Sequence, residues 1–186
     1  LLICTDGSKG TWDVDADTDI LIARRQDEQR EAARRIHPEA QVHFLGEVDG
    51  ELANTIELRG RVARVIRETT PDIVLGHDPW RRWRMHPDHR NAGFLTVDAV
   101  VAARDPHYHR EHMADGLTYH RPRALLLFEC EEPDHVERIE QRHVDAKVKA
   151  LLAHESQFET TMVIAADDDG TQAAAFRERT ERKART

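Results

Sequence analysis

Short apolar segments alternate with longer amphipathic ones along most of this chain, and this alternation limits its possible folds more than any other feature. Brief apolar runs between turn residues are typical of buried strands, and longer segments with one apolar face are typical of helices. We expect strands at residues 1–4, 41–45, 72–75 and 124–128, and helices at residues 18–36, 54–69, 87–103 and 134–154. This order predicts an α/β fold with right-handed crossovers and a mainly parallel sheet.

Local sequence patterns set the expected helix starts. Asn54 with Glu57, and Asp134 with Glu137, have the three-residue spacing of a capping box. Pro87 suits the first position of a helix, because proline lacks the N–H group that a helix start leaves unpaired. These patterns predict helices that begin close to residues 54, 87 and 134.

Length and composition narrow the class of protein. The 186 residues are enough for one domain with its own core, which we place at residues 1–160; residues 161–186 are charged and predict a tail or a peripheral helix. A net charge of −8 argues against nucleic acid as a partner, because a nucleic-acid surface needs clustered Lys and Arg. No apolar run approaches the roughly 20 residues of a membrane span. Two cysteines outside any metal-binding spacing fit a reducing cytoplasm, the predicted location.

Polar and turn-forming residues follow each predicted strand directly. They are Asp6 and Gly7, Gly46, Gly76 with His77 and Asp78, and Glu129. Parallel strands present their carboxyl ends at one edge of a sheet, and open α/β sheets bind ligands at that edge. We therefore expect a ligand site there, with Asp6 and Asp78 among the residues that contact the substrate.

The segment Met85-His86-Pro87-Asp88-His89-Arg90 carries the strongest chemical signal. Two histidines three positions apart at a helix start can reach the same side of the helix. A helix N-terminus disfavours a protonated imidazole, which keeps the ring able to bind a metal. A carboxylate between the histidines can orient a ring through its N–H. An ordinary helix start with surface histidines explains the same spacing, so spacing alone leaves both interpretations open.

The chain resembles the LmbE-like (PIG-L) deacetylases from Leu1 to about Phe158. The similar segments, in the order found in the family, are ICTDGSKG, RRQDEQREAARRI, VHFLGEVDGEL, PDIVLGHDP, HPDHRNAG, ALLLFE and VKALLAHESQ. The most specific combination is HPDHR after a strand that ends in HDP, with TDG upstream. The resemblance implies a Rossmann-like three-layer fold and the removal of an N-acetyl group from an N-acetylglucosamine-type conjugate.

The same resemblance implies roles for individual residues. His89 matches a ligand of a single zinc ion, with another divalent ion such as Fe2+ as the alternative metal. His86 matches the histidine that stabilises the oxyanion and protonates the leaving amine, and Asp88 matches the carboxylate that orients it. Arg25 stands where the family has an arginine that faces the substrate. The implied partner is a small amino-sugar conjugate, and the family is compatible with a homo-oligomer.

One family motif has no counterpart in the chain. A His-Pro-Asp-Asp loop, which supplies two further metal ligands and the general base in this family, matches no segment and would precede Leu1. We therefore expect the first strand and the metal loop to be missing. One histidine cannot define a tetrahedral zinc site, so these 186 residues are predicted to be inactive alone. Deacetylation by this chain with added zinc would contradict that prediction.

Two other readings of the function stay open. One is a non-catalytic α/β sugar-binding protein or degenerate family member, and the other is an amidase acting on a thiol-sugar conjugate. Two further patterns also have alternatives. The H-x-H-x-x-H pattern from His107 to His112 can catch a metal or form an ordinary polar loop. Three loop tryptophans can stack on a sugar or anchor their loops: Trp12, Trp80 and Trp83.

Overall fold

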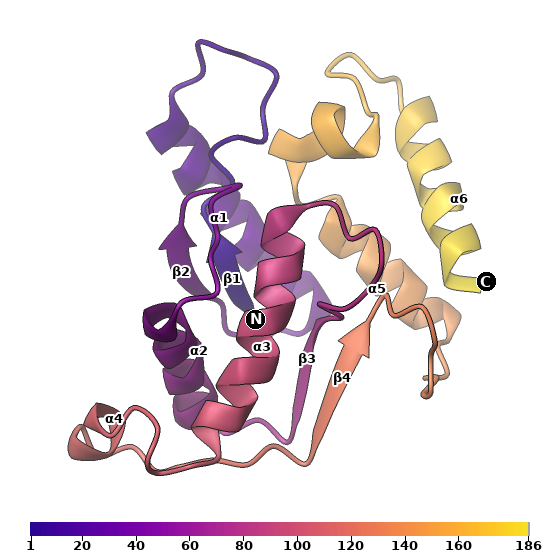
Figure 1. Ribbon diagram of the computed structural model, residues 1–186. Helices are drawn as coiled ribbons and strands as arrows, with labels where there is room; N and C mark the ends of the chain where they lie inside the picture. Colours follow the sequence, from indigo (N-terminus) through magenta and orange to yellow (C-terminus); the bar gives the residue numbers. More distant parts are fainter. Residues whose placement is uncertain (186) are drawn as a thin grey trace. The chain divides into compact units, whose positions relative to one another are not determined.

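The chain forms two compact units in the computed structural model, which describes residues 1–185. Unit 1 holds Leu1–Asp49 and the segment from His135 onward, and unit 2 holds Gly50–Asp134. Each unit contains helices and one pair of parallel strands (Figure 1). The predicted α/β class and the parallel pairing are confirmed, and the described strands belong to two sheets of two strands each.

Unit 1 combines one strand pair with helices from both ends of the chain. Its elements are β1 (Leu2–Thr5), α1 (Thr18–Ile36), β2 (His43–Glu47), α5 (Gln141–Leu151), the 3-10 turn η1 (Glu155–Gln157), the π-helical turn η2 (Phe158–Met162) and α6 (Thr171–Arg185). β1 pairs with β2 through Leu2 opposite His43 and Ile3 opposite Phe44. Asp17 caps α1 by accepting from the second and third N–H groups after it, which explains why this helix starts where predicted.

Small and medium apolar side chains form the core of unit 1. Ala32 of α1 is buried together with Ala150 and Ala153, and such short side chains allow α1 and α5 to pack closely. A second cluster joins Phe176 of α6 to two residues near η2. The C-terminal segment contains the helix α6, which packs through Phe176. The division at residues 160 and 161 stays a prediction.

Unit 2 carries the second strand pair and a pair of packed helices. Its elements are α2 (Ile56–Thr69), β3 (Ile73–His77), α3 (Pro87–Ala103), the short α4 (Glu111–Ala114) and β4 (Ala124–Phe128). β3 and β4 are in register from Ile73 opposite Ala124 to His77 opposite Phe128. α2 and α3 bury faces with helical spacing, formed by Leu58, Val62, Ala63 and Ile66 on α2 and by Leu95, Ala99, Ala102 and Ala103 on α3.

A glycine lets α3 approach the end of β3. A Cβ atom added at Gly93 would lie 2.6 Å from the carbonyl oxygen of His77 and 3.0 Å from the side chain of Pro79. Any larger residue would push the helix away from the strand. The glycine at this position therefore keeps the first turns of α3 directly beside the carboxyl end of β3.

The predicted capping residue of α2 and the predicted start of α5 were wrong. α2 is capped by Thr55, whose Oγ accepts from the N–H of Leu58 at 3.1 Å, whereas Asn54 donates to the Asp98 carboxylate. α5 begins seven residues later than its predicted start at residue 134, because Glu140 and His143 form the capping box there. Short capping patterns recur along a polar chain, and packing selects among them.

Two smaller expectations concern the membrane and the cysteines. Among the residues that the structure describes, no helix is both long and apolar enough to cross a bilayer. Cys4 and Cys130 are half-buried thiols.

Candidate functional site

Stacked imidazole rings mark the carboxyl end of β3 in unit 2. The rings of His77 and His89 are nearly parallel, with their centroids 4.7 Å apart and an angle of 9° between their planes. His86 stacks on His89 as well, at 4.7 Å and 22°. His89 is therefore the ring that both stacked pairs share. The strand end and the start of α3, which the sequence predicted to be chemically active, meet at this point.

His86 forms the N-cap of α3 through its ring. Its Nδ1 accepts a hydrogen bond from the backbone N–H of Asp88 at 3.3 Å. An accepting nitrogen carries no proton, so the neutral ring has its proton on Nε2. His86 thus presents an N–H donor, which is the group that an oxyanion requires.

The buried carboxylate of Asp88 holds a nearby loop in place. It is 5% exposed and accepts from the N–H groups of Gly50 at 2.6 Å and Leu52 at 3.1 Å. The contact between Asp88 and His86 is made by the backbone N–H, although ligand atoms of the two side chains lie within 4.8 Å of each other. The predicted role of the carboxylate in orienting His86 stays a prediction.

A buried arginine joins the ends of β3 and β4, and sequence reasoning missed it. The Arg84 guanidinium contacts Nδ1 of His77 at 2.9 Å and the Glu129 carboxylate at 2.9 Å. Its side chain is 4% exposed, while the neighbouring Arg82 is exposed. The only sequence signal was the position of Glu129 directly after a strand, because the run RRWR does not reveal which arginine is buried.

The surroundings of His77 and His89 favour the neutral form of these two imidazoles. Burial lowers the pKa of His89, and the nearby His86 and Arg84 lower it further against the opposing effects of Glu129 and Asp88. Burial likewise lowers the pKa of His77, with His89 and Arg84 acting in the same direction. A neutral ring keeps the lone pair that metal binding needs.

Asp78 and the nearby tryptophans shape the loop after β3. The Asp78 carboxylate accepts from the N–H of Trp80 at 3.0 Å, and its own N–H donates to the carbonyl of Phe128. A substrate contact of Asp78 stays a prediction. Trp80 lies edge-on to Phe94 at 6.1 Å, which fits a loop anchor, whereas Trp83 is 83% exposed.

In unit 1, Arg25 and Asp6 both hold the loop after β1. Arg25 donates to the carbonyl oxygens of Gly7 and Gly10, the latter at 2.5 Å. Asp6 accepts from the N–H groups of Ser8 at 2.9 Å and Asp49 at 3.0 Å. Burial opposes ionisation of Asp6, but these hydrogen bonds outweigh it and lower the pKa of the carboxyl. Substrate contacts of Arg25 and Asp6 stay predictions.

Sequence reasoning also missed a contact in unit 1, between α1 and η1. The Glu28 carboxylate of α1, 9% exposed, accepts from the N–H of Ser156 at 2.8 Å and from its hydroxyl at 2.6 Å. This contact fastens η1 to α1. The adjacent His154 has a buried Nδ1 with no hydrogen-bond partner among the residues described, and burial lowers its pKa.

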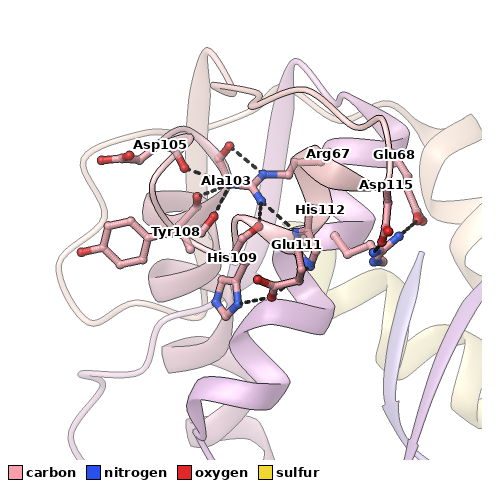
Figure 2. A network of polar contacts seen from close by, with 11 residues as sticks. Arg67, Glu68, Ala103, Asp105, Tyr108, His109, Glu111, His112 and Asp115 are labelled. Carbon is pink, nitrogen blue, oxygen red and sulfur yellow. Dashed lines mark hydrogen bonds and ion pairs between the residues drawn. The ribbon is translucent and has the colours of Figure 1, made fainter.

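The histidine-rich loop of unit 2 meets a buried arginine (Figure 2). Ligand atoms of His109, Glu111 and His112 lie within 4.8 Å of one another, as in a metal site. However, Arg67 donates to Nδ1 of His112 at 2.8 Å. Arginine has no acceptor, so Nδ1 holds the lone pair and the neutral ring carries its proton on Nε2. A cation at His112 would have to displace that proton beside a fixed positive charge, which disfavours a metal here.

Arg67 instead closes the C-terminal end of α3. Its guanidinium, in a residue 2% exposed, donates to backbone carbonyl oxygens of the helix end and the following loop (Figure 2). The acceptors are Ala102 at 2.9 Å, Ala103 at 3.2 Å, Asp105 at 2.9 Å, Tyr108 at 3.0 Å and His109 at 3.2 Å. The carbonyl groups that end a helix carry partial negative charge, which stabilises the buried cation.

This network predicts a pH-dependent stability for unit 2. Burial lowers the pKa of His112 below its ordinary value of 6.5; Arg64, Arg67 and His109 lower it further, against Glu111. His112 therefore binds a proton more readily in the unfolded chain than in the folded one. Its contribution to the free energy of unfolding is fully present above pH 6.5 and is lost as the pH decreases below that value. Urea unfolding between about pH 5 and 8 measures this slope.

The matched variant is His112→Gln, which can still accept from Arg67 but does not titrate. Its stability should fall less steeply with decreasing pH than that of the natural chain. Equal slopes for the two proteins would show that His112 does not contribute.

Within each unit, the structure brings predicted site residues together. Unit 2 contains Asp78, His86, Asp88 and His89, and unit 1 contains Asp6 and Arg25. Unit 2 therefore holds the residues predicted to bind metal and to transfer a proton, and unit 1 holds two of those predicted to bind the sugar.

Comparison with known proteins connects this geometry to a family. The profile of the PIG-L family, described as GlcNAc-PI de-N-acetylase, matches residues 1–100. A diacetylchitobiose deacetylase of Thermococcus kodakarensis is 37% identical over 157 residues, covering 84% of this chain and 58% of the relative. The chain thus spans less than two thirds of that relative.

Solved structures show the same architecture. An N,N'-diacetylchitobiose deacetylase from Pyrococcus horikoshii, in complex with its inhibitor MPG, is similar with a TM-score of 0.80 and 29% identity, over 95% of this chain and 63% of that one. A conserved protein of Thermus thermophilus has a TM-score of 0.67 and 25% identity, over 98% of this chain and 73% of that one. A 4-carboxy-2-hydroxymuconate hydratase of Pseudomonas putida, 19% identical with a TM-score of 0.71 over 98% of this chain and 70% of that one, shares the fold alone.

Proposed function

The chain belongs to the PIG-L family, and from that membership we propose that the protein removes the N-acetyl group from an N-acetylglucosamine-type conjugate. The observation that carries this proposal is the start of α3, where His86 and His89 stack at the carboxyl end of β3. The deacetylase names of the Thermococcus and Pyrococcus relatives support it. Residues 1–160 would form the deacetylase domain.

The imidazole of His89 could supply one ligand to a divalent metal at this end of β3. His89 would hold zinc, because imidazole nitrogen is one of the ligands zinc prefers, and Fe2+ is an alternative that also accepts nitrogen. When bound, the metal would polarise the amide carbonyl and activate water for attack. The stack with His77 and His86 restricts the rotation of the His89 ring, which favours a single ligand geometry.

His86 would act as the proton-bearing group. Because its Nδ1 accepts from the Asp88 N–H, its Nε2–H would stabilise a developing oxyanion. To protonate the leaving amine as well, the ring would donate from its imidazolium form, in which Nδ1 carries a second proton and no longer accepts from that N–H. Asp88 would support this role by anchoring the first turn of α3 to the loop at Gly50 and Leu52.

Sugar hydroxyl groups would be bound by Arg25, Asp6 and Asp78. Each offers charged donors or acceptors, and each lies beside the carboxyl end of a strand in its own unit. We further propose a small amino-sugar conjugate as the partner, a cytoplasmic location and, in keeping with the family, assembly into a homo-oligomer.

The test is acetate release from diacetylchitobiose by the chain together with any sequence that naturally flanks it. Activity should depend on zinc and disappear with a chelator. Sugar binding without acetate release would favour the non-catalytic alternative. Cleavage of a thiol-sugar conjugate in preference to diacetylchitobiose would favour the amidase.

The His86→Ala variant separates proton transfer from metal binding. We expect kcat to fall about 100- to 1000-fold, the usual effect of losing one oxyanion donor, and zinc affinity to fall by a much smaller factor because His77 still stacks on His89. The control is His107→Ala, because His107 is an exposed histidine of the distant loop. A parallel loss of zinc, or unchanged kcat, would argue against this role of His86.

A further inference from the structure

Arg84 is a loop residue whose charged side chain is nevertheless buried. It lies between β3 and α3, and its side chain is 4% exposed. Its Nη1 is 2.9 Å from Nδ1 of His77 and 2.9 Å from the Glu129 carboxylate, and its Nη2 is 3.4 Å from the Glu129 carbonyl oxygen. One guanidinium therefore links the last residue of β3 to the residue that follows β4.

The contact with Arg84 determines which nitrogen of the His77 ring carries the proton. A guanidinium only donates, so the contacted Nδ1 of His77 must carry the lone pair and the proton must be on Nε2. The bond also limits rotation of the ring. Phe128, opposite His77 in the strand pair, packs against the same ring with centroids 4.4 Å apart.

His77 in turn forms a flat surface for His89. Their ring planes differ by 9° at a centroid distance of 4.7 Å, so a rotation of one ring requires the other to move. Contacts that fix His77 therefore also restrict His89. In many metal sites a hydrogen bond to the second ring nitrogen orients the histidine ligand, and here a stacked ring restricts His89 instead.

The backbone conformation of Glu129 indicates that its contacts with the neighbouring arginines hold it firmly. Its φ is +58°, in the left-handed region that residues with a side chain seldom adopt. Such a conformation persists where surrounding contacts hold it, and here Arg84 binds both its carboxylate and its carbonyl while Arg81 lies 3.5 Å from the carboxylate.

We propose that Arg84 is a positioning residue, which acts through His77 to set the orientation of the His89 ring. The inference rests on the proposed function, because it treats His89 as a metal ligand. Arg84 itself touches neither metal nor substrate in this account. Arg84 holds the His77 ring and the residue after β4, Glu129, in fixed positions relative to each other.

The test compares Arg84→Met with Arg82→Met, which removes an exposed arginine from the same loop. Long-range proton–nitrogen NMR correlations in the metal-free protein report the protonated nitrogen of His77 and the environment of His89. Zinc affinity is measured separately by titration of the chain together with its natural flanking sequence. We expect Arg84→Met to give a mixture of His77 tautomers, shifted His89 ring signals and a zinc affinity lowered about 10- to 100-fold, with Arg82→Met unchanged.

A conservative variant keeps the test decisive if Arg84→Met unfolds. Arg84→Lys retains the charge but not the planar fork, and it should show the same changes in smaller degree. An unchanged His77 tautomer and unchanged His89 signals in a folded Arg84 variant would overturn the inference. If the natural protein binds no zinc, the proposed metal site fails, while the ring signals still decide the role of Arg84.

Discussion

The Arg67→Met variant is expected to unfold with a free energy about 3–5 kcal/mol lower than that of the natural chain. The guanidinium, in a residue 2% exposed, is the shared donor for five backbone carbonyl groups and one imidazole nitrogen. Methionine preserves much of the apolar stem but donates no hydrogen bond. Each acceptor left buried without a donor costs about 1–3 kcal/mol, and partial entry of water reduces the sum.

Urea unfolding followed by circular dichroism measures this effect. The matched control is Arg64→Met, one turn earlier on α2, because Arg64 pairs with Asp115 and Glu68 at the exposed surface. Exposed ion pairs contribute little to stability, so the control should unfold close to the natural chain. Equal losses in the two variants would show that Arg67 does not secure the end of α3.

The His89→Ala variant is expected to lose zinc more severely than any other single change in unit 2. Loss of a residue that only supports a metal ligand already lowers affinity about 10- to 100-fold, so loss of the ligand itself should exceed about 100-fold. Deacetylation by the chain with its natural flanking sequence should then fall below detection. Zinc titration and acetate release measure the two effects independently.

A second substitution separates metal binding from packing at this position. His89→Phe keeps an aromatic ring that can stack on His77 and His86 but provides no nitrogen lone pair. It should keep the stability of the natural chain and lose zinc as completely as His89→Ala. Zinc affinity that survives in the folded His89→Phe protein would exclude His89 as a ligand.

Much of the fold could be predicted from the sequence because local signals and burial agree there. The predicted ranges 18–36, 87–103 and 124–128 coincide with α1, α3 and β4. β3 continues two residues beyond its predicted end, through Gly76 to His77, because its pairing with β4 extends to Phe128. Polar residues at a strand end resemble a turn in the sequence, and only the neighbouring strand reveals that they are paired.

The candidate site was predictable where its residues are adjacent in sequence. His86, Asp88 and His89 share one helix start, so their spacing alone places them together. The contact of Arg84 with Glu129 spans 45 residues, as does that of Arg67 with His112. Such pairs depend on how strands and helices pack, and nothing in an arginine-rich loop or helix distinguishes the buried arginine from the exposed ones.

The backbone contact at Gly93 has a practical consequence for redesign. The helix that carries His89 and the strand that carries His77 meet main chain to main chain there, at a separation that admits no side chain. The distance between helix and strand is thus set by this backbone contact, while Arg84 in the intervening loop contacts the His77 ring. Exposed loop positions such as Trp83 can be diversified to recruit new sugars, provided that residue 93 stays without a side chain.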